Sequence, residues 1–251
     1  LHPEMCRKAL DRDLHVLCEK PMALDSSGCE EMLEAASDSD ALLMVAHCLR
    51  FRPEYVYLKE TIESDRFGAL QNLMFWRASP PPDWSMEDWM LDIEQSGGPI
   101  LDLHIHDVDF AQFLLGSPEN IHCTGEGPGD TNYSAVNAVF SYGDGPTVYI
   151  GCDQMLPQSH PFEMRYTATF EKGCLTFTTA RDPGLMEFTK QGQEHPHVKH
   201  GDGYTEEVDY FVECIENNEA PAVCPPRASA ESVRLVEAER ESIDSGETVS
   251  L

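Results

Sequence analysis

The chain has 251 residues, with 45 Asp and Glu against 17 Lys and Arg and a net charge of −28. A surface with this excess of negative charge repels the phosphates of nucleic acids and the headgroups of anionic lipids. Neither nucleic acid nor a membrane surface is therefore an expected partner. The longest strongly apolar run, residues 41–46, is far too short to span a bilayer. Such acidity occurs in salt-adapted proteins and in ordinary acidic ones, and a titration of stability against KCl distinguishes the two.

The nine cysteines are scattered through the chain with no C-x-x-C motif. An odd, scattered set, often placed within apolar runs, predicts reduced and buried thiols in a cytoplasmic protein. No charged-then-apolar signal segment opens the chain.

Residues 1–48 predict a partial doubly wound (Rossmann-type) α/β sheet. A helix is expected over 2–10, a strand over 14–18, a helix over 27–36 and a second strand over 41–46. Ser27 and Glu30 have the spacing of a capping box that opens the second helix. Because both strands are continuously apolar, we expect a parallel sheet that is covered on both faces.

Residues 49–226 predict an α+β domain with a large, mostly antiparallel open sheet. Helices are expected over 53–64, 99–115 and 204–217, and strands over 70–78, 133–142, 147–155, 162–170 and 174–179. The polar stretch 191–203 is expected to be an exposed loop. Residues 227–251 then form a C-terminal helix, over 228–245, and a tail.

The expected helix 99–115 is apolar over most of its circumference and carries Asp102 and His106. Polar residues in a buried helix are costly unless they are paired or used. Four residues apart, the two side chains share a face, so the carboxylate can hydrogen-bond the imidazole and prepare it as a general base. A satisfied pair in the core is the alternative.

Two further segments follow the expected strands. Lys20 lies in Cys18-Glu19-Lys20-Pro21, at the carboxyl end of a strand, where open α/β sheets bind ligands. Arg50-Phe51-Arg52-Pro53 follows the next strand and would suit a clamp on an anionic group. An exposed lysine in a turn and two solvated arginines are the simpler interpretations.

Taken in order, these motifs resemble the glucose–fructose oxidoreductase/inositol dehydrogenase (Gfo/Idh/MocA) family of NAD(P)-dependent oxidoreductases. They are Val16-Leu17-Cys18-Glu19-Lys20-Pro21, Arg50-Phe51-x-Pro53 and Gly97-Gly98-x-x-x-Asp102-x-x-x-His106-x-x-Asp109. The tail, with Tyr204-x-x-Glu207-x-x-x-Phe211 and Ala238-x-x-Glu241-Ser242-x-x-x-Gly246-x-x-Val249, is also similar to this family.

The resemblance implies hydride transfer between NAD or NADP and a hydroxyl carbon of a sugar, polyol or related small molecule. The implied catalytic residues are Lys20, Asp102 and His106. His106 would accept the hydroxyl proton, Asp102 would orient His106, and Lys20 would hydrogen-bond the reacting oxygen. The implied cofactor-binding residues are His2, Glu19, Lys20, Pro21 and Arg50, with a non-standard Lys20–Pro21 peptide bond.

The residues expected to bind substrate are Trp84, His104, Asp109, His160 and Tyr166, with Asp83 and Trp89 beside them. Indole rings that stack on sugar faces would suit a polyhydroxylated ring. The resemblance also implies a homo-oligomer that packs through the antiparallel sheet.

The chain departs from the family pattern at three places. His104 stands where the family usually has glycine, and Cys48 stands where an asparagine is common. The phosphate-binding G-x-G-x-x-G is also missing. On the order of 60–90 family residues are therefore expected to lie upstream. We expect the chain as given to be a fragment that binds NAD(P) weakly and is inactive alone, and a low-micromolar calorimetric affinity for NADH would contradict this.

Two other classes of function stay open. Asp102, His104 and His106 could form the ligand cluster of a metal-dependent hydrolase, although two imidazoles two residues apart on a helix point about 200° apart. No metal is therefore expected, and a zinc assay distinguishes the two enzymes. A non-catalytic binding or oligomerisation module is the third class, and it would tolerate alanine at Lys20 and His106.

Overall fold

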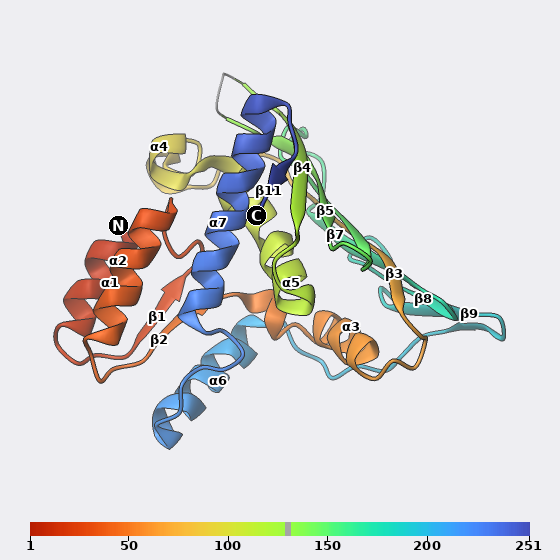
Figure 1. Cartoon of the computed structure of the whole chain (residues 1–251), viewed down its shortest axis with the longest axis horizontal. Helices are drawn as coiled ribbons and strands as arrows, with labels where there is room; N and C mark the ends of the chain where they lie inside the picture. Colours follow the sequence, from red (N-terminus) through yellow and green to blue (C-terminus); the bar gives the residue numbers. More distant parts are fainter. Residues whose placement is uncertain (129–131) are drawn as a thin grey trace.

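The computed structural model describes residues 1–128 and 132–251, which form two sheets with helices between and around them (Figure 1). The α-helices are α1 His2–Leu10, α2 Ser26–Ser37, α3 Pro53–Glu63, α4 Ile93–Ser96, α5 Ile105–Leu115, α6 Tyr204–Asn217 and α7 Pro226–Ser245. The strands are β1 Val16–Glu19, β2 Leu43–Ala46, β3 Leu70–Ala78, β4 Asn120–Glu126, β5 Ala135–Ser141, β6 Thr147–Asp153, β7 Glu163–Phe170, β8 Gly173–Thr178, β9 Met186–Thr189, β10 Gly192–Glu194 and β11 Val249–Ser250. In these ranges no helix has the length and apolar character needed to cross a membrane.

The smaller sheet consists of β1 and β2, which run parallel as predicted. Each strand begins two residues later than the apolar pattern predicts. Apolar side chains of α1 and α2 pack in the same core cluster as Cys18 and Val45. Met44 packs against Phe211 of α6, so both faces of the sheet are covered.

The start of α2 differs from the prediction. The cap is Asp25, whose carboxylate accepts a hydrogen bond of 2.8 Å from the Gly28 N–H, and the helix begins at Ser26. The expected capping box at Ser27 and Glu30 is therefore wrong. A carboxylate at the position before the first turn is the better cap, because it also meets the positive end of the helix dipole.

The larger sheet has the strand order β10-β9-β8-β7-β3-β6-β5-β4-β11. Among the described strand pairs of this sheet, only β3 and β6 run parallel, so the predicted mostly antiparallel open sheet is confirmed. Strands β4, β9, β10 and β11 were not predicted. The last three are short, and β10 lies inside the stretch expected to be a loop.

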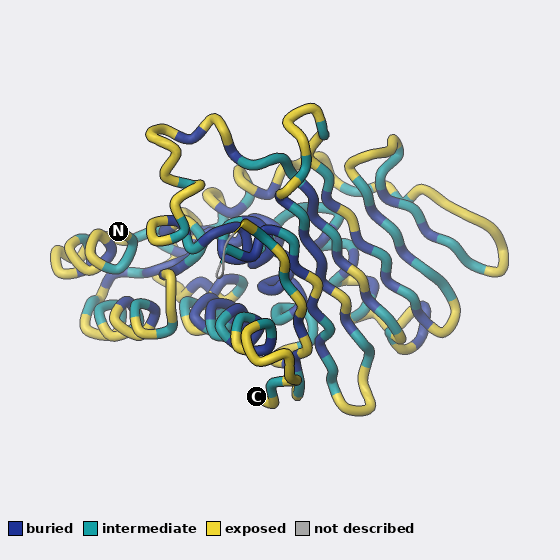
Figure 2. The backbone as a smooth tube through the Cα atoms, turned by 90° about the horizontal axis from the view of Figure 1, so that it is seen from above, coloured by how far each residue is buried: buried dark blue, intermediate teal, exposed yellow. Residues whose placement is uncertain are grey.

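Helices α3, α5 and α7 lie on one side of the larger sheet (Figure 1), and buried and exposed residues alternate along its strands (Figure 2). The Tyr55 ring of α3 meets Phe110 of α5 at 4.9 Å and Tyr166 of β7 at 5.3 Å, both edge to face. Helix α7 contacts α2 and β2 of the smaller sheet as well as α5 and β4. It therefore links the two sheets. The boundaries proposed at residues 48 and 226 stay a prediction.

The expected helix 99–115 is not regular. Ile100–His104 forms a π-helical turn, and α5 follows it. Gly97 ends α4 with a φ of +75°, and a Cβ there would lie 2.5 Å from Leu101 Cδ1. Glycine at this position permits both the reversal of the chain and the close approach of Leu101.

Candidate active site

The turn after β1 forms one wall of the candidate site. Lys20 lies just past the carboxyl end of β1, and the Lys20–Pro21 peptide bond is cis, as predicted. His2 Nδ1 lies 2.8 Å from the carbonyl oxygen of Pro21. His2 therefore fixes the turn from the start of α1, while Glu19 is exposed beside it.

Lys20 reaches the π-helical turn, 82 residues further along the chain. Its ammonium donates hydrogen bonds of 2.7 Å to Asp102 Oδ1 and 2.7 Å to the Asp102 carbonyl oxygen. The two side chains are 16% and 23% exposed. An ammonium has three N–H donors, so one donor of Lys20 stays free for a ligand.

His106 lies next to this pair but does not bond to Asp102. Its Nδ1 is buried without a hydrogen-bond partner among the described residues. Burial, together with the positive charges of Lys20 and Arg77, holds its pKa well below the usual value, so the ring is neutral at neutral pH. The predicted Asp102–His106 hydrogen bond is wrong, because the cation of Lys20 takes the carboxylate.

Lys20, Asp102 and His106 line one cavity of about 570 Å³. Polar groups that could bind a ligand share its wall with aromatic and apolar side chains. The other lining residues are Cys48, Leu49, Arg52, Arg77, Ser79, Pro82, Trp84, Met90, Leu103, Gln154, Phe162, Met164, Asp202 and Tyr204. A concave site of this size, with a few convergent polar groups, is typical of small-molecule binding.

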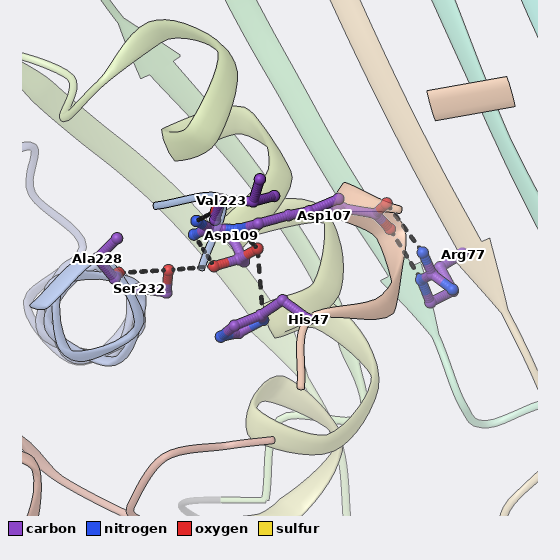
Figure 3. Close-up of polar contacts among 8 residues, drawn as sticks. His47, Arg77, Asp107, Asp109, Val223, Ala228 and Ser232 are labelled. Carbon is purple, nitrogen blue, oxygen red and sulfur yellow. Dashed lines mark hydrogen bonds and ion pairs between the residues drawn. The ribbon is translucent and has the colours of Figure 1, made fainter. Parts of the chain in front are cut away.

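The cavity wall also contains a buried ion pair. Arg77 of β3 donates to both carboxylate oxygens of Asp107, at 2.9 and 3.0 Å, and Figure 3 shows the pair on one side of α5. Burial would lower the pKa of Arg77, but the Asp107 carboxylate outweighs it and raises the pKa. A fixed positive charge therefore faces His106.

Asp109 points to the other side of α5 and anchors a second buried cluster (Figure 3). Arg50 donates to both Asp109 oxygens, at 2.9 and 2.6 Å, and to the Val223 carbonyl at 2.8 Å. Ser232 of α7 donates to Asp109 at 2.8 Å, and His47 Nδ1 lies 3.3 Å away. Burial holds the pKa of His47 at about 4.

The structure therefore does not support the predicted contacts of Arg50 with cofactor and of Asp109 with substrate. Both side chains are 1% exposed and are satisfied by each other. Their role in this geometry is to join the segment after β2 to α5 and α7.

His104 likewise does not line the cavity. It is fully buried, and its Nε2 lies 2.9 Å from Glu239 Oε1. Burial alone would lower the pKa of His104, but the Glu239 carboxylate raises it well above the usual value. Since His104 faces α7 and His106 faces the cavity, the two imidazoles cannot share a metal ion. Among the residues that the structure describes, no group of three His, Cys, Asp or Glu side chains converges as metal ligands.

Of the remaining predicted substrate residues, only Trp84 lines the cavity, at its rim, where it is 76% exposed. Tyr166 is buried, and its hydroxyl donates to the Glu54 carbonyl at 2.7 Å. His160 lies on a turn outside the cavity lining, with Nδ1 2.7 Å from the Pro161 carbonyl oxygen. Neither Tyr166, which lies in the aromatic core, nor His160, which lies two residues before the lining residue Phe162, lines the cavity itself.

Several polar residues of the cavity were not predicted from the sequence, notably Arg77, Ser79 and Gln154. Arg77 was visible as a charge inside an apolar strand. Ser79 and Gln154 directly follow Ala78 and Asp153, which pair at the ends of the parallel strands β3 and β6. Parallel strands present their carboxyl ends at one edge, but this pairing could not be read from the sequence.

Comparison with known proteins gives the same family twice. Residues 1–47 match the model described as "Oxidoreductase family, NAD-binding Rossmann fold" (GFO_IDH_MocA), and residues 55–176 match the GFO/IDH/MocA C-terminal domain. The chain is 26% identical to D-xylose 1-dehydrogenase (NADP(+)) 2 of Haloferax volcanii, over 100% of this chain and 77% of that protein. It is 25% identical to inositol 2-dehydrogenase of Rhizobium meliloti, over 86% of this chain and 67% of that protein. Among solved structures, the aldose-aldose oxidoreductase of Caulobacter crescentus has the same fold, with a TM-score of 0.84 at 21% identity over 100% of this chain and 76% of that one.

Proposed function

The chain belongs to the GFO/IDH/MocA family of NAD-binding oxidoreductases, and we propose that it transfers hydride between NAD or NADP and a hydroxyl carbon of a sugar or polyol. The observation that carries this proposal is the convergence of Lys20, Asp102 and His106 on one cavity. The xylose and inositol dehydrogenases among the relatives support the substrate class.

The residues present fit the nicotinamide end of such a cofactor. Glu19, Lys20 and Pro21 form a turn at the carboxyl end of a parallel strand, beside a free ammonium donor. The 251 residues contain no G-x-G-x-x-G, so they account for this end of the cofactor site and not for the pyrophosphate loop. When bound, the nicotinamide supplies the acceptor or donor of the hydride.

Oxidation of the substrate also requires removal of a hydroxyl proton. His106 is neutral and faces the cavity, so its imidazole can accept this proton as the C–O bond becomes a carbonyl. The third donor of Lys20 can hydrogen-bond the same oxygen and stabilise its developing negative charge. Asp102 acts through Lys20, because it fixes the direction of the ammonium.

The rest of the cavity suits a polyhydroxylated molecule. Ser79, Gln154 and Tyr204 offer hydrogen-bonding groups, while Trp84 and Phe162 offer flat apolar surface. Sugars present hydroxyls around the ring edge and C–H groups on the faces, which matches this mixture.

The test uses the protein as its gene encodes it. Purified enzyme is incubated with NAD⁺ or NADP⁺ and with D-xylose, myo-inositol or D-glucose, and the absorbance of reduced nicotinamide is followed. We expect reduction with at least one pair. No reduction with any pair, together with bound zinc and hydrolysis that stops on zinc removal, would support the metal-dependent hydrolase instead.

The partner on the open face of the larger sheet is proposed to be a second copy of the chain. Met74 and Tyr149 lie opposite each other on β3 and β6 and are 38% and 44% exposed. Exposed apolar side chains in adjacent strands favour burial against another apolar surface. Light scattering should find a dimer or larger oligomer that Tyr149→Lys dissociates, and an unaltered mass in the variant would contradict this interface.

The proposed location is the cytoplasm. All nine cysteines are free, and eight of them are buried. Free thiols in this number are typical of proteins in a reducing compartment.

A further inference from the structure

A second cavity of about 580 Å³ lies beside the candidate active site. It is formed by the start of α3, the end of β8 with the turn after it, and the polar segment that follows β10. Six cationic or imidazole side chains line it: Arg52, Arg181, His195, His197, Lys199 and His200.

This lining differs in charge from the rest of the molecule. In the whole chain, Asp and Glu outnumber Lys and Arg by 45 to 17, whereas the cavity has two carboxylates, Glu54 and Asp182, against three Lys and Arg. Three of the ten histidines also line it. In a protein of net charge −28, a concave surface with this excess of N–H donors is a local site of attraction for anions.

The two cavities share a wall. Arg52 lines both, and the neighbouring residues Gly201 and Asp202 line one cavity each. Met164 of the catalytic cavity and Thr179 of the second cavity are joined by a 3.1 Å hydrogen bond from the Met164 N–H to Thr179 Oγ1. The second cavity therefore adjoins the one that holds Lys20 and His106, with Arg52 at their boundary.

The two arginines are held in place by other groups. Arg181 donates through Nε and Nη2 to the carbonyls of Pro183 and Gly184, both at 3.1 Å. Arg52 lies over the Phe177 ring at 5.6 Å, with Nε 3.0 Å from Glu54 Oε2. A guanidinium has five N–H donors, so each arginine keeps donors for a ligand after these contacts are made.

We propose that the second cavity is an anion subsite, which binds a carboxylate or phosphate group of the substrate while its reacting carbon lies at Lys20 and His106. Fixed guanidinium forks match the oxygen geometry of both groups. The substrate class is then an acidic or phosphorylated carbohydrate. The link to substrate rests on the proposed oxidoreductase function, whereas anion binding itself does not.

The first test is therefore made without cofactor or sugar. Inorganic phosphate is titrated into the protein at constant ionic strength, and the imidazole NMR signals are followed. We expect saturable shifts of the His195, His197 and His200 signals, with a dissociation constant of about 1–10 mM. The double variant Arg181→Gln/Lys199→Gln should bind at least tenfold more weakly. The matched control is Lys190→Gln, which replaces an exposed lysine in the turn between β9 and β10 that does not line the cavity, and this variant should bind phosphate as the parent does.

The second test compares D-glucose, D-glucuronate and D-glucose 6-phosphate as substrates. The double variant should lower kcat/KM about tenfold for D-glucuronate or for D-glucose 6-phosphate and leave kcat/KM for D-glucose unchanged. The substrate whose kcat/KM falls shows whether the cavity binds a carboxylate or a phosphate group. No saturable phosphate binding, or equal binding by the double variant, overturns the anion subsite. Phosphate binding without any change in substrate preference overturns its link to the substrate.

Discussion

Replacement of Asp109 by Asn tests whether Arg50 stabilises the fold through its ion pair with Asp109 or contacts the cofactor. The substitution keeps the shape of the side chain and one acceptor oxygen, but it leaves the Arg50 guanidinium, 1% exposed, without the carboxylate charge that balances it. Removing one partner of a buried ion pair costs about 3–5 kcal/mol, because the remaining charge stays desolvated. With a urea dependence of about 3 kcal/mol per M, this lowers the unfolding midpoint by roughly 1–2 M.

Two other variants make this measurement specific. Glu30→Gln removes an exposed pair with Arg227 and should change the free energy of unfolding by less than about 0.5 kcal/mol. Arg50→Met/Asp109→Leu removes both buried charges and should recover most of the loss. Two results together would refute a structural role for the Arg50–Asp109 pair: Asp109→Asn lowers the free energy of unfolding by less than about 1 kcal/mol, and an Arg50 variant loses only affinity for NAD(P). Arg50 would then contact the cofactor, as the sequence predicted.

Three further predictions concern pH, backbone and salt. Glu207 is buried near Glu19 and Asp202, and burial together with these carboxylates raises its pKa from 4.5 to about 8. Between these values the unfolded chain loses a proton that the folded chain keeps, so stability falls as pH rises. Glu207→Gln should therefore be more stable than the parent at pH 8 by up to about 5 kcal/mol and nearly equal at pH 4, and a difference independent of pH in denaturant titrations would contradict this. Gly97→Ala should lose about 1–3 kcal/mol of stability, measured in the same way, because its φ is +75° and its Cβ meets Leu101; an unchanged midpoint would contradict the strain. The melting temperature should rise with KCl from low to molar concentrations, because salt screens repulsion within a chain of charge −28, and a flat profile would remove salt adaptation as an explanation of the acidity.

Helix-opening residues and runs of apolar residues correctly predicted several helices and both strands of the smaller sheet. Pro53 opens a helix, and the continuously apolar runs before Lys20 and Cys48 form parallel strands, because burial on both faces leaves no alternation. The ordered motifs predicted the family, and through it the meeting of Lys20, Asp102 and His106.

Contacts between distant segments were less predictable. Asp102 and His106 have the spacing of a bonded pair, but a lysine 82 residues away takes the carboxylate. Charged side chains are usually exposed, so Arg50 and Asp109 were expected to contact ligands. Only the tertiary structure shows that the two are buried and form an ion pair with each other. The missed strands β9 to β11 owe their pairing to a neighbouring strand rather than to their own composition.

The central claim is that His106 accepts the proton of the reacting hydroxyl and that Lys20 stabilises the negative charge that develops on its oxygen. Its most direct test is the steady-state rate of NAD(P)⁺ reduction by Lys20→Met and His106→Asn, in the protein as its gene encodes it. Lys8→Met and His122→Asn, at exposed residues that do not line the cavity, serve as matched controls. We predict that kcat/KM falls at least about 100-fold in each site variant, with unchanged melting temperature and normal activity of both controls. Site variants that keep their activity within about threefold of the parent would contradict the claim, because a positioned acid–base group contributes far more than that.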